Sequence, residues 1–244
     1  MSDSLLLEAK GLTKRFGGLV AVSEVDFALG QGQIVGLIGP NGAGKSTVFN
    51  TLSGFYRADG GSVVFKGRDI TRRKPYEICR EGIARTFQIP RPFSDLPVID
   101  NVTAAALYGR GSTSGIVAAR KRGLETLAFV GLARKRDALA RSLPLMDRKR
   151  LELARALATQ PELLLLDEVF AGLTEAEAEE AIALIRNIRR ELGITVFMIE
   201  HVMKTVMATC ENIIVMHYGK KIAEGRPGEV AHNPAVIAAY LGQG

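Results

Sequence analysis

The sequence contains only two cysteines, Cys79 and Cys210, and neither belongs to a C-x-x-C pair. This scarcity argues against a disulfide scaffold and against a cysteine-bound metal, and it is typical of a cytosolic protein with reduced thiols. Apolar runs near the ~20 residues that span a bilayer are also lacking. Residues 1–8 have neither the basic start nor the long apolar core of a signal peptide. We therefore expect a soluble, cytoplasmic chain.

Charge of one sign is not concentrated in any long segment. The 32 lysines and arginines exceed the 26 aspartates and glutamates, so the formal net charge is 32 − 26 = +6. The longest basic runs are short, Arg72–Lys74 and Arg120–Arg122. Scattered surface charge is therefore the favoured interpretation, and no nucleic-acid partner is expected. With 244 residues, of which 47% are hydrophobic, the chain can bury the core of one large α/β domain or of a domain with a subdomain.

The most informative segment that is present runs from Gly39 to Thr47 and reads GPNGAGKST. It fits the P-loop pattern G-x-x-x-x-G-K-[ST]. An apolar run, Ile34–Ile38, precedes it, and Thr47–Leu52 follows with helical spacing. A strand–loop–helix of this kind directs backbone N–H groups and the positive end of a helix at phosphate. Lys45 can then reach the β- and γ-phosphates, and the Ser46 hydroxyl can ligate Mg²⁺. The sequence predicts binding of a nucleoside triphosphate.

Strand-like and helix-like segments alternate along much of the chain, which favours a mostly parallel sheet. The expected strands are 5–9, 25–29, 34–38, 62–66, 83–87, 163–166, 195–199 and 213–216, and 62–66 is expected to pair antiparallel near the P-loop. The expected helices are 47–52, 77–80, 116–130, 148–158 and one that ends near Arg190 after a capping box at Thr174 and Glu177. Pro90, Pro92 and Pro97 indicate a loop, and residues 109–115 are rich in glycine and serine. The sequence therefore predicts that a helical subdomain, at about residues 89–157, is inserted between two parts of the core sheet.

The apolar run Leu163–Leu166 ends in two acids, Asp167 and Glu168. A strand followed by Asp-Glu is by itself more often a strand-to-turn transition, but together with an upstream P-loop the pair indicates a functional site. In this arrangement, known as Walker B, Asp167 would hold Mg²⁺ and Glu168 would polarise the attacking water.

At this point the chain resembles the nucleotide-binding subunits of ATP-binding cassette (ABC) transporters. The resemblance implies the P-loop NTPase ABC ATPase fold, α/β with a mostly parallel core sheet, an antiparallel β subdomain and an inserted helical subdomain. It implies one domain over 1–244, with the core in 1–88 and 158–244 and the helical subdomain in 89–157. It also implies ATP and Mg²⁺ as cofactors.

Roles for individual residues follow from the same resemblance. Phe16 matches the aromatic residue that stacks on adenine, Gln88 the Q-loop glutamine, and His201 the switch histidine that contacts the γ-phosphate. Ala171–Thr174 resembles the D-loop, which crosses the dimer interface. The implied catalytic residues are Glu168, His201, Lys45 and Gln88. The implied nucleotide-binding residues are Phe16, Val22, Gly39, Pro40, Asn41, Gly42, Ala43, Gly44, Lys45, Ser46 and Thr47, and the implied metal ligands are Ser46, Gln88 and Asp167.

The chain departs from the family at the signature L-S-G-G-Q, which in one subunit caps the triphosphate held by the other. Counting back from the matching stretch 150–157, the signature position reads Leu143-Pro144-Leu145-Met146-Asp147. Proline lacks a backbone N–H, and methionine replaces a glycine that lets the backbone approach phosphate. Asp147 adds negative charge, or it N-caps the following helix. Two hypotheses remain open. Either a different subunit supplies the competent signature, which we favour, or the helix start after Asp147 supports slow turnover.

Several segments resemble the ATPases of importers for branched-chain and other hydrophobic amino acids. They are 15–22, 82–88, 199–203 and the tail 232–242. That group implies two different ATPases on integral membrane permease subunits, an external substrate-binding protein, and a peripheral location on the inner face of the cell membrane. Urea, amides and aromatic acids remain alternative solutes. A soluble regulatory or assembly ATPase, and a nucleotide-binding subunit with almost no hydrolysis, remain alternative functions.

Overall fold

The structure is a computed structural model that describes residues 5–110 and 115–241. Parts of three predicted segments therefore lie outside the described residues: both ends of the 1–244 domain, residues 111–114 of the Gly/Ser-rich stretch, and Gly242 in the tail. The chain divides into two compact units, Met1–Pro75 with Arg186–Gly244, and Tyr76–Ile185. The subdomain boundaries at 89 and 157 remain a prediction. Among the described residues, no helix is both long and apolar enough to cross a bilayer.

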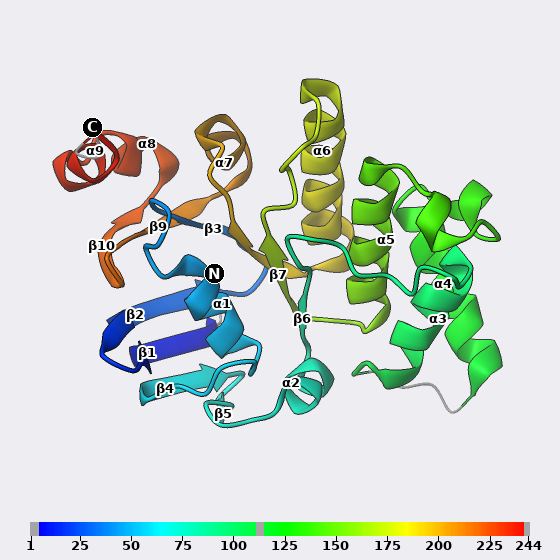
Figure 1. The fold of residues 1–244 in the computed structure, drawn as a ribbon, viewed down its shortest axis with the longest axis horizontal. Helices are drawn as coiled ribbons and strands as arrows, with labels where there is room; N and C mark the ends of the chain where they lie inside the picture. The colour runs from blue at the N-terminus through cyan, green and yellow to red at the C-terminus, as the bar shows by residue number, and fades with distance from the viewer. Residues whose placement is uncertain (1–4, 111–114, 242–244) are drawn as a thin grey trace. The chain divides into compact units, whose positions relative to one another are not determined.

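The first unit contains an antiparallel sheet with the strand order β2-β1-β4-β5 (Figure 1). Its strands are β1 (Leu5–Phe16), β2 (Leu19–Gly30), β4 (Gly60–Phe65) and β5 (Arg68–Asp69). The predicted antiparallel pairing is confirmed, because β4 pairs with β1 through Ala9 opposite Val63. Strands β1 and β2 are longer than the sequence predicted.

The P-loop follows the central strand of the second sheet in this unit. There β3 (Ile34–Ile38) runs parallel to β8 (Thr195–Ile199) on one side and to β9 (Asn212–His217) on the other, and β10 (Lys220–Gly225) pairs antiparallel with β9. Every residue of β3 and β8 is buried, as expected for strands of a parallel sheet covered on both faces. These two strands match their predicted bounds.

Helix α1 (Lys45–Leu52) leaves the P-loop and is fixed by aromatic packing. The Phe49 ring lies 5.1 Å from Phe197 on β8, and Phe197 lies 5.6 Å from Phe27 on β2. These contacts tie the helix to both sheets of the unit. The tail adds α7 (Met203–Thr209), α8 (Pro227–Ala231) and α9 (Pro234–Leu241), none of which was predicted.

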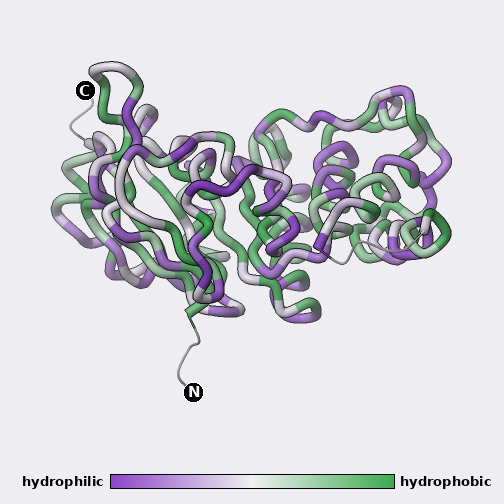
Figure 2. The backbone as a smooth tube through the Cα atoms, turned by 90° about the horizontal axis from the view of Figure 1, so that it is seen from below, coloured by the Kyte–Doolittle hydropathy of each residue, from purple (hydrophilic) through white to green (hydrophobic). Residues whose placement is uncertain are grey.

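The second unit contains one parallel strand pair and a group of helices. Strand β6 (Ile83–Arg85) pairs with β7 (Leu163–Asp167), and its helices are α2 (Pro75–Glu81), α3 (Val98–Tyr108), α4 (Ile116–Phe129) and α5 (Leu145–Ala158), with 3₁₀ turns at Ala133–Lys135 and Ala140–Ser142. Helix α6 (Glu175–Leu192) begins here, and its residues from Arg186 onward belong to the first unit. Hydrophobic and hydrophilic stretches alternate along the helices (Figure 2), which is the pattern of helices buried on one face.

The predicted loop at Pro90, Pro92 and Pro97 is confirmed, since residues 86–97 form no helix. Helix α3, which was not predicted, begins directly after it, with Pro97 as its N-cap and Val98, Val102 and Ala106 as a buried stripe. Two other predictions about this unit were wrong. Strand β6 ends at Arg85 rather than at residue 87. Helix α5 begins at Leu145, so the altered signature residues lie in its first turn and Pro144 is the N-cap.

Candidate nucleotide site

Two glycines of the P-loop are required by close backbone contacts. Gly39 has φ 147°, and a Cβ there would lie 2.1 Å from the carbonyl oxygen of Met216 on β9. Gly44 has φ 100°, and a Cβ there would lie 2.4 Å from the carbonyl oxygen of Ala21. Only glycine adopts such conformations without a steric penalty. The backbone carbonyls of two neighbouring strands therefore exclude any residue larger than glycine at these two positions of the P-loop.

Lys45 holds the loop closed. Its Nζ donates to the carbonyl oxygens of Gly39 at 2.7 Å and Pro40 at 2.8 Å, and the side chain is buried. In contrast, Asn41, Gly42 and Ser46 are exposed on the loop and at the start of α1. The ammonium thus lies inside the loop, where the sequence predicted a phosphate contact.

Phe16 and Val22, both predicted to contact nucleotide, differ in exposure. Phe16 is 42% exposed at the end of β1, and its ring makes an edge contact with Tyr56 at 5.1 Å. The Lys14 ammonium lies 5.3 Å from the same ring. Val22 is fully buried on β2. Phe16 therefore presents a face to solvent that Val22 does not.

His201 and Tyr240 also lie near the P-loop strand. Because β8 is parallel to β3, with Ile199 opposite Leu37, the exposed His201 follows the same edge of the sheet as Gly39. On α9, burial raises the pKa of the Tyr240 phenol, while a hydrogen bond with the Gly39 backbone opposes that shift. The tail tyrosine was not singled out by the sequence, because its only signal is this contact.

The second unit brings together Gln88 and Glu168. Gln88 Nε2 donates to Glu168 Oε2 at 2.6 Å, because β6 and β7 are parallel and both residues follow the same edge. Glu168 has φ 48°, a left-handed conformation that is uncommon for residues other than glycine. Such strain is often found at functional sites.

Asp167 forms a buried ion pair that the sequence did not predict. Arg85 lies 2.7 Å from Asp167 Oδ2, and the two side chains are only 8% and 9% exposed. The Arg85 guanidinium also lies 5.2 Å from the Phe87 ring. The Asp167 backbone N–H donates to Thr86 Oγ1 at 3.3 Å. A cation therefore already contacts the carboxylate that was predicted to hold Mg²⁺.

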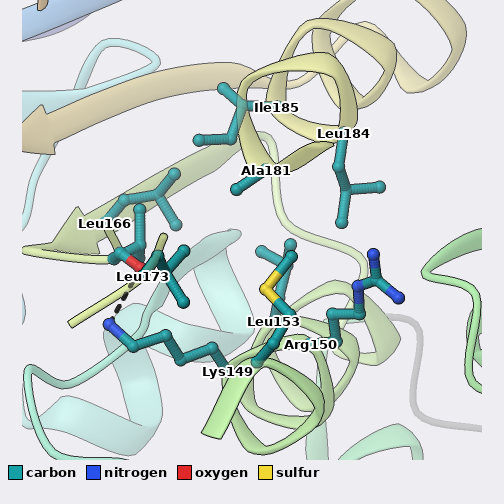
Figure 3. Close-up of a pocket in the computed structure, with 10 residues that line it drawn as sticks. Lys149, Arg150, Leu153, Leu166, Leu173, Ala181, Leu184 and Ile185 are labelled. Carbon is teal, nitrogen blue, oxygen red and sulfur yellow. Dashed lines mark hydrogen bonds between the residues drawn. The ribbon is translucent and has the colours of Figure 1, made fainter. Parts of the chain in front are cut away.

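The altered signature forms the first turn of α5. Asp147 does not N-cap the helix; it lies inside the first turn and pairs with Lys135, which offsets its charge. Met146 is buried and lines a pocket with Leu153, Leu166 and Leu173 (Figure 3). Leu145, by contrast, is 46% exposed.

Helix α5 also holds the segment around Gln88. Glu152 accepts a hydrogen bond from the Phe87 backbone N–H at 2.5 Å, and Arg155 donates to the Arg91 carbonyl at 2.8 Å. Burial raises the pKa of the Glu152 carboxyl and lowers the pKa of the Arg155 guanidinium. The Arg155 guanidinium lies 5.3 Å from the Phe93 ring.

The predicted capping box precedes α6. Glu177 Oε2 accepts hydrogen bonds from the Thr174 backbone N–H at 2.8 Å and from its hydroxyl at 2.9 Å, and the Glu177 N–H donates to the Thr174 hydroxyl at 3.3 Å. These bonds lower the pKa of the Glu177 carboxyl. The box therefore fixes the end of the Ala171–Thr174 segment.

A P-loop between a buried parallel strand and a helix defines the chain as a P-loop nucleoside triphosphatase. The family model described as ABC transporter matches residues 22–171, more than half of the chain. The chain belongs to the ABC transporter family and is an ATPase of that family. A second model, for the branched-chain amino acid ATP-binding cassette transporter, matches residues 220–244.

Curated relatives and solved structures agree with this family. The branched-chain amino acid transport ATP-binding protein BraF of Pseudomonas aeruginosa is 39% identical over 98% of both chains. LivG of Salmonella typhimurium is 41% identical over 98% of both. MJ1267, an ATP-binding cassette in its ADP conformation, has a TM-score of 0.88 at 31% identity, with 98% of this chain and 99% of that chain covered. A dimeric MJ0796 cassette bound to ADP and Pi has a TM-score of 0.80 at 26% identity, covering 91% and 99%.

Proposed function

We propose that the chain is the ATP-hydrolysing subunit of an importer for branched-chain or related hydrophobic amino acids. One observation carries the solute class. Similarity to branched-chain amino acid transport proteins extends over nearly the whole chain, and the separate model of that group matches the tail at 220–244. The ATPase does not itself bind the solute in this proposal, so the solute follows from kinship alone.

The proposed residue roles follow the local geometry of each unit. Phe16 provides the exposed ring for adenine. Lys45 and the N–H groups of Gly39–Thr47 bind the phosphates. Glu168, oriented by its hydrogen bond with Gln88, activates the attacking water, and His201 contacts the γ-phosphate.

Mg²⁺ is part of the proposal because the donor set suits it. Ser46, Gln88 and Asp167 offer hydroxyl, amide and carboxylate oxygens, the ligands that Mg²⁺ takes. The amide oxygen of Gln88 is not used in its bond to Glu168. When bound, Mg²⁺ would offset the charge of the phosphates.

We further propose that a different ATPase subunit completes the dimer. Pro144 offers no backbone N–H, and a glycine is replaced by Met146, whose side chain packs inside its own unit. Both features support an impaired signature in this chain. Permease subunits are proposed to bind the segment after Gln88, where Ile89 and Phe93 are 68% and 52% exposed. This contact would place the chain on the inner face of the cell membrane, served by an external binding protein.

The transport proposal is tested by uptake of labelled leucine into vesicles that contain the assembled complex. Glu168→Gln is expected to abolish uptake and to lower hydrolysis to a small residual rate while ATP still binds, because only the proposed base is lost. Glu125→Gln, on exposed α4 surface, is the matched control. Hydrolysis without leucine uptake would refute the solute class, whereas full hydrolysis by Glu168→Gln would refute the role of Glu168.

The heterodimer proposal is tested by measuring ATP hydrolysis with this chain alone and after addition of the candidate partner ATPase. We expect little activity alone and a large increase with the partner that depends on Glu168 of this chain. The full rate from the isolated chain would show that its own signature suffices.

A further inference from the structure

Glu168 depends on its surroundings to remain in its left-handed conformation. A residue other than glycine at φ 48° is held there at a cost of about 1–3 kcal/mol, so neighbouring contacts must stabilise it. On the side-chain end, the contact is the hydrogen bond from Gln88 Nε2. On the backbone end, the contact comes from helix α5.

Lys149 makes that backbone contact. Its Nζ donates to the carbonyl oxygen of Val169 at 2.9 Å and lies 3.5 Å from the carbonyl oxygen of Glu168. Figure 3 shows the Lys149 side chain extended from α5, with a dashed line at its hydrogen bond. A charged donor makes a stronger bond than a neutral one. The bond therefore restrains the turn that begins at Glu168, directly after β7.

The helix that carries Lys149 is itself fixed against this turn. Met146 and Leu153, one turn before and after Lys149, lie on the same face of α5. They line the pocket with Leu166 of β7 and Leu173, which flank the turn on both sides (Figure 3). The cavity left between them is about 30 Å³, which is too small for a ligand and indicates packing. This packing therefore fixes the position of helix α5 beside the turn, and with it the position of the Lys149 ammonium.

We propose that Lys149 is a positioning residue for ATP hydrolysis. By binding the carbonyls of Glu168 and Val169, it keeps the Glu168 carboxylate within reach of Gln88. The proposal rests on the proposed role of Glu168 as the base. It also gives the altered signature helix a function inside its own subunit, since the first turns of α5 support this chain's own glutamate.

The test compares Lys149→Met, Lys149→Gln and Lys149→Arg in the assembled complex, with the partner ATPase inactivated so that only hydrolysis dependent on Glu168 is measured. Lys149→Met is expected to lower kcat by about tenfold, the effect of losing one hydrogen bond to a charged group. Arg and Gln keep a donor and should restore part of the rate. ATP affinity should stay unchanged, because the P-loop is not touched. Lys121→Met, an exposed lysine of α4, is the matched control.

The Glu168→Gln background separates this proposal from the proposed base. There Lys149→Met should have no further effect on the residual rate, because Lys149 acts through Glu168. An unchanged kcat in Lys149→Met, or an equal loss in all three variants, would overturn the positioning role. So would a loss of the same size in the Glu168→Gln background. A parent-like rate in Glu168→Gln would instead overturn the base assignment. If Lys149→Met melts early, Lys149→Gln decides instead, because its partial loss of kcat should likewise disappear in the Glu168→Gln background.

Discussion

Removing Arg85 is expected to destabilise the second unit strongly. Arg85→Met would leave the Asp167 carboxylate about nine-tenths buried without its 2.7 Å partner. Breaking one side of a buried ion pair costs about 3–5 kcal/mol, and the residual exposure of both groups favours about 3. The lost guanidinium–ring contact at Phe87, 5.2 Å from the centroid, adds about 0.5–1 kcal/mol. The total of about 3–4 kcal/mol corresponds to a decrease of roughly 10 °C in Tm for a chain of this size.

The assay is thermal unfolding without nucleotide, followed by circular dichroism and calorimetry. The double variant Arg85→Met with Asp167→Asn should recover most of the lost stability, because the uncompensated charge is gone. Arg141→Met is the matched control, since its partner is Asp95 and the pair is 63% and 81% exposed, where ion pairs contribute about 0–1 kcal/mol. A Tm for Arg85→Met close to that of Arg141→Met would refute the reasoning, as would additive losses in the double variant.

Three further perturbations follow from the geometry. Gly39→Ala should lower the free energy of unfolding by at least about 2 kcal/mol and weaken ATP binding, because the added Cβ would clash with the Met216 carbonyl. Gly42→Ala, whose added Cβ would have no atom within 4 Å, should lower the stability less. Equal melting temperatures of the two variants would contradict this. Met146→Ala should lower the free energy of unfolding, measured in urea, by about 2–3 kcal/mol, because it leaves a cavity in the packed interior. A change below about 0.5 kcal/mol would contradict the burial of Met146. Burial raises the pKa of Cys210 to about 12 from 9.0. Since the unfolded thiol deprotonates first, stability should fall by about 1 kcal/mol from pH 8 to pH 10, a loss that Cys210→Ala should abolish.

Elements with a strong local pattern could be predicted from the sequence. Strands β3 and β8 match because continuous apolar runs are bounded by turn residues. The capping box at Thr174 and Glu177 was predictable because both partners lie within one turn. Helix α3 was missed because nearby prolines outweighed a short apolar stripe, although proline is tolerated at a helix start.

The contacts that organise the candidate site could not be predicted in the same way. Arg85 and Asp167 are 82 residues apart in the chain, and Gln88 and Glu168 are 80 apart. Only the parallel pairing of β6 with β7 brings them together. The strand that ends in two acids predicted Asp167 and Glu168, and the resemblance added Gln88, but nothing in the local sequence pairs Arg85 with an acid or Lys149 with a carbonyl.

The two hydrogen bonds from Lys45 to the carbonyls of Gly39 and Pro40 have a consequence for how nucleotide affinity is understood. A phosphate that recruits this ammonium must replace bonds that already exist. Affinity then reports the difference between two sets of hydrogen bonds rather than the strength of one set. A Lys45→Ala chain would consequently lose the conformation of the loop together with its charge. Ser46→Ala, at an exposed position, leaves those two bonds intact and isolates the contribution of ligand contact.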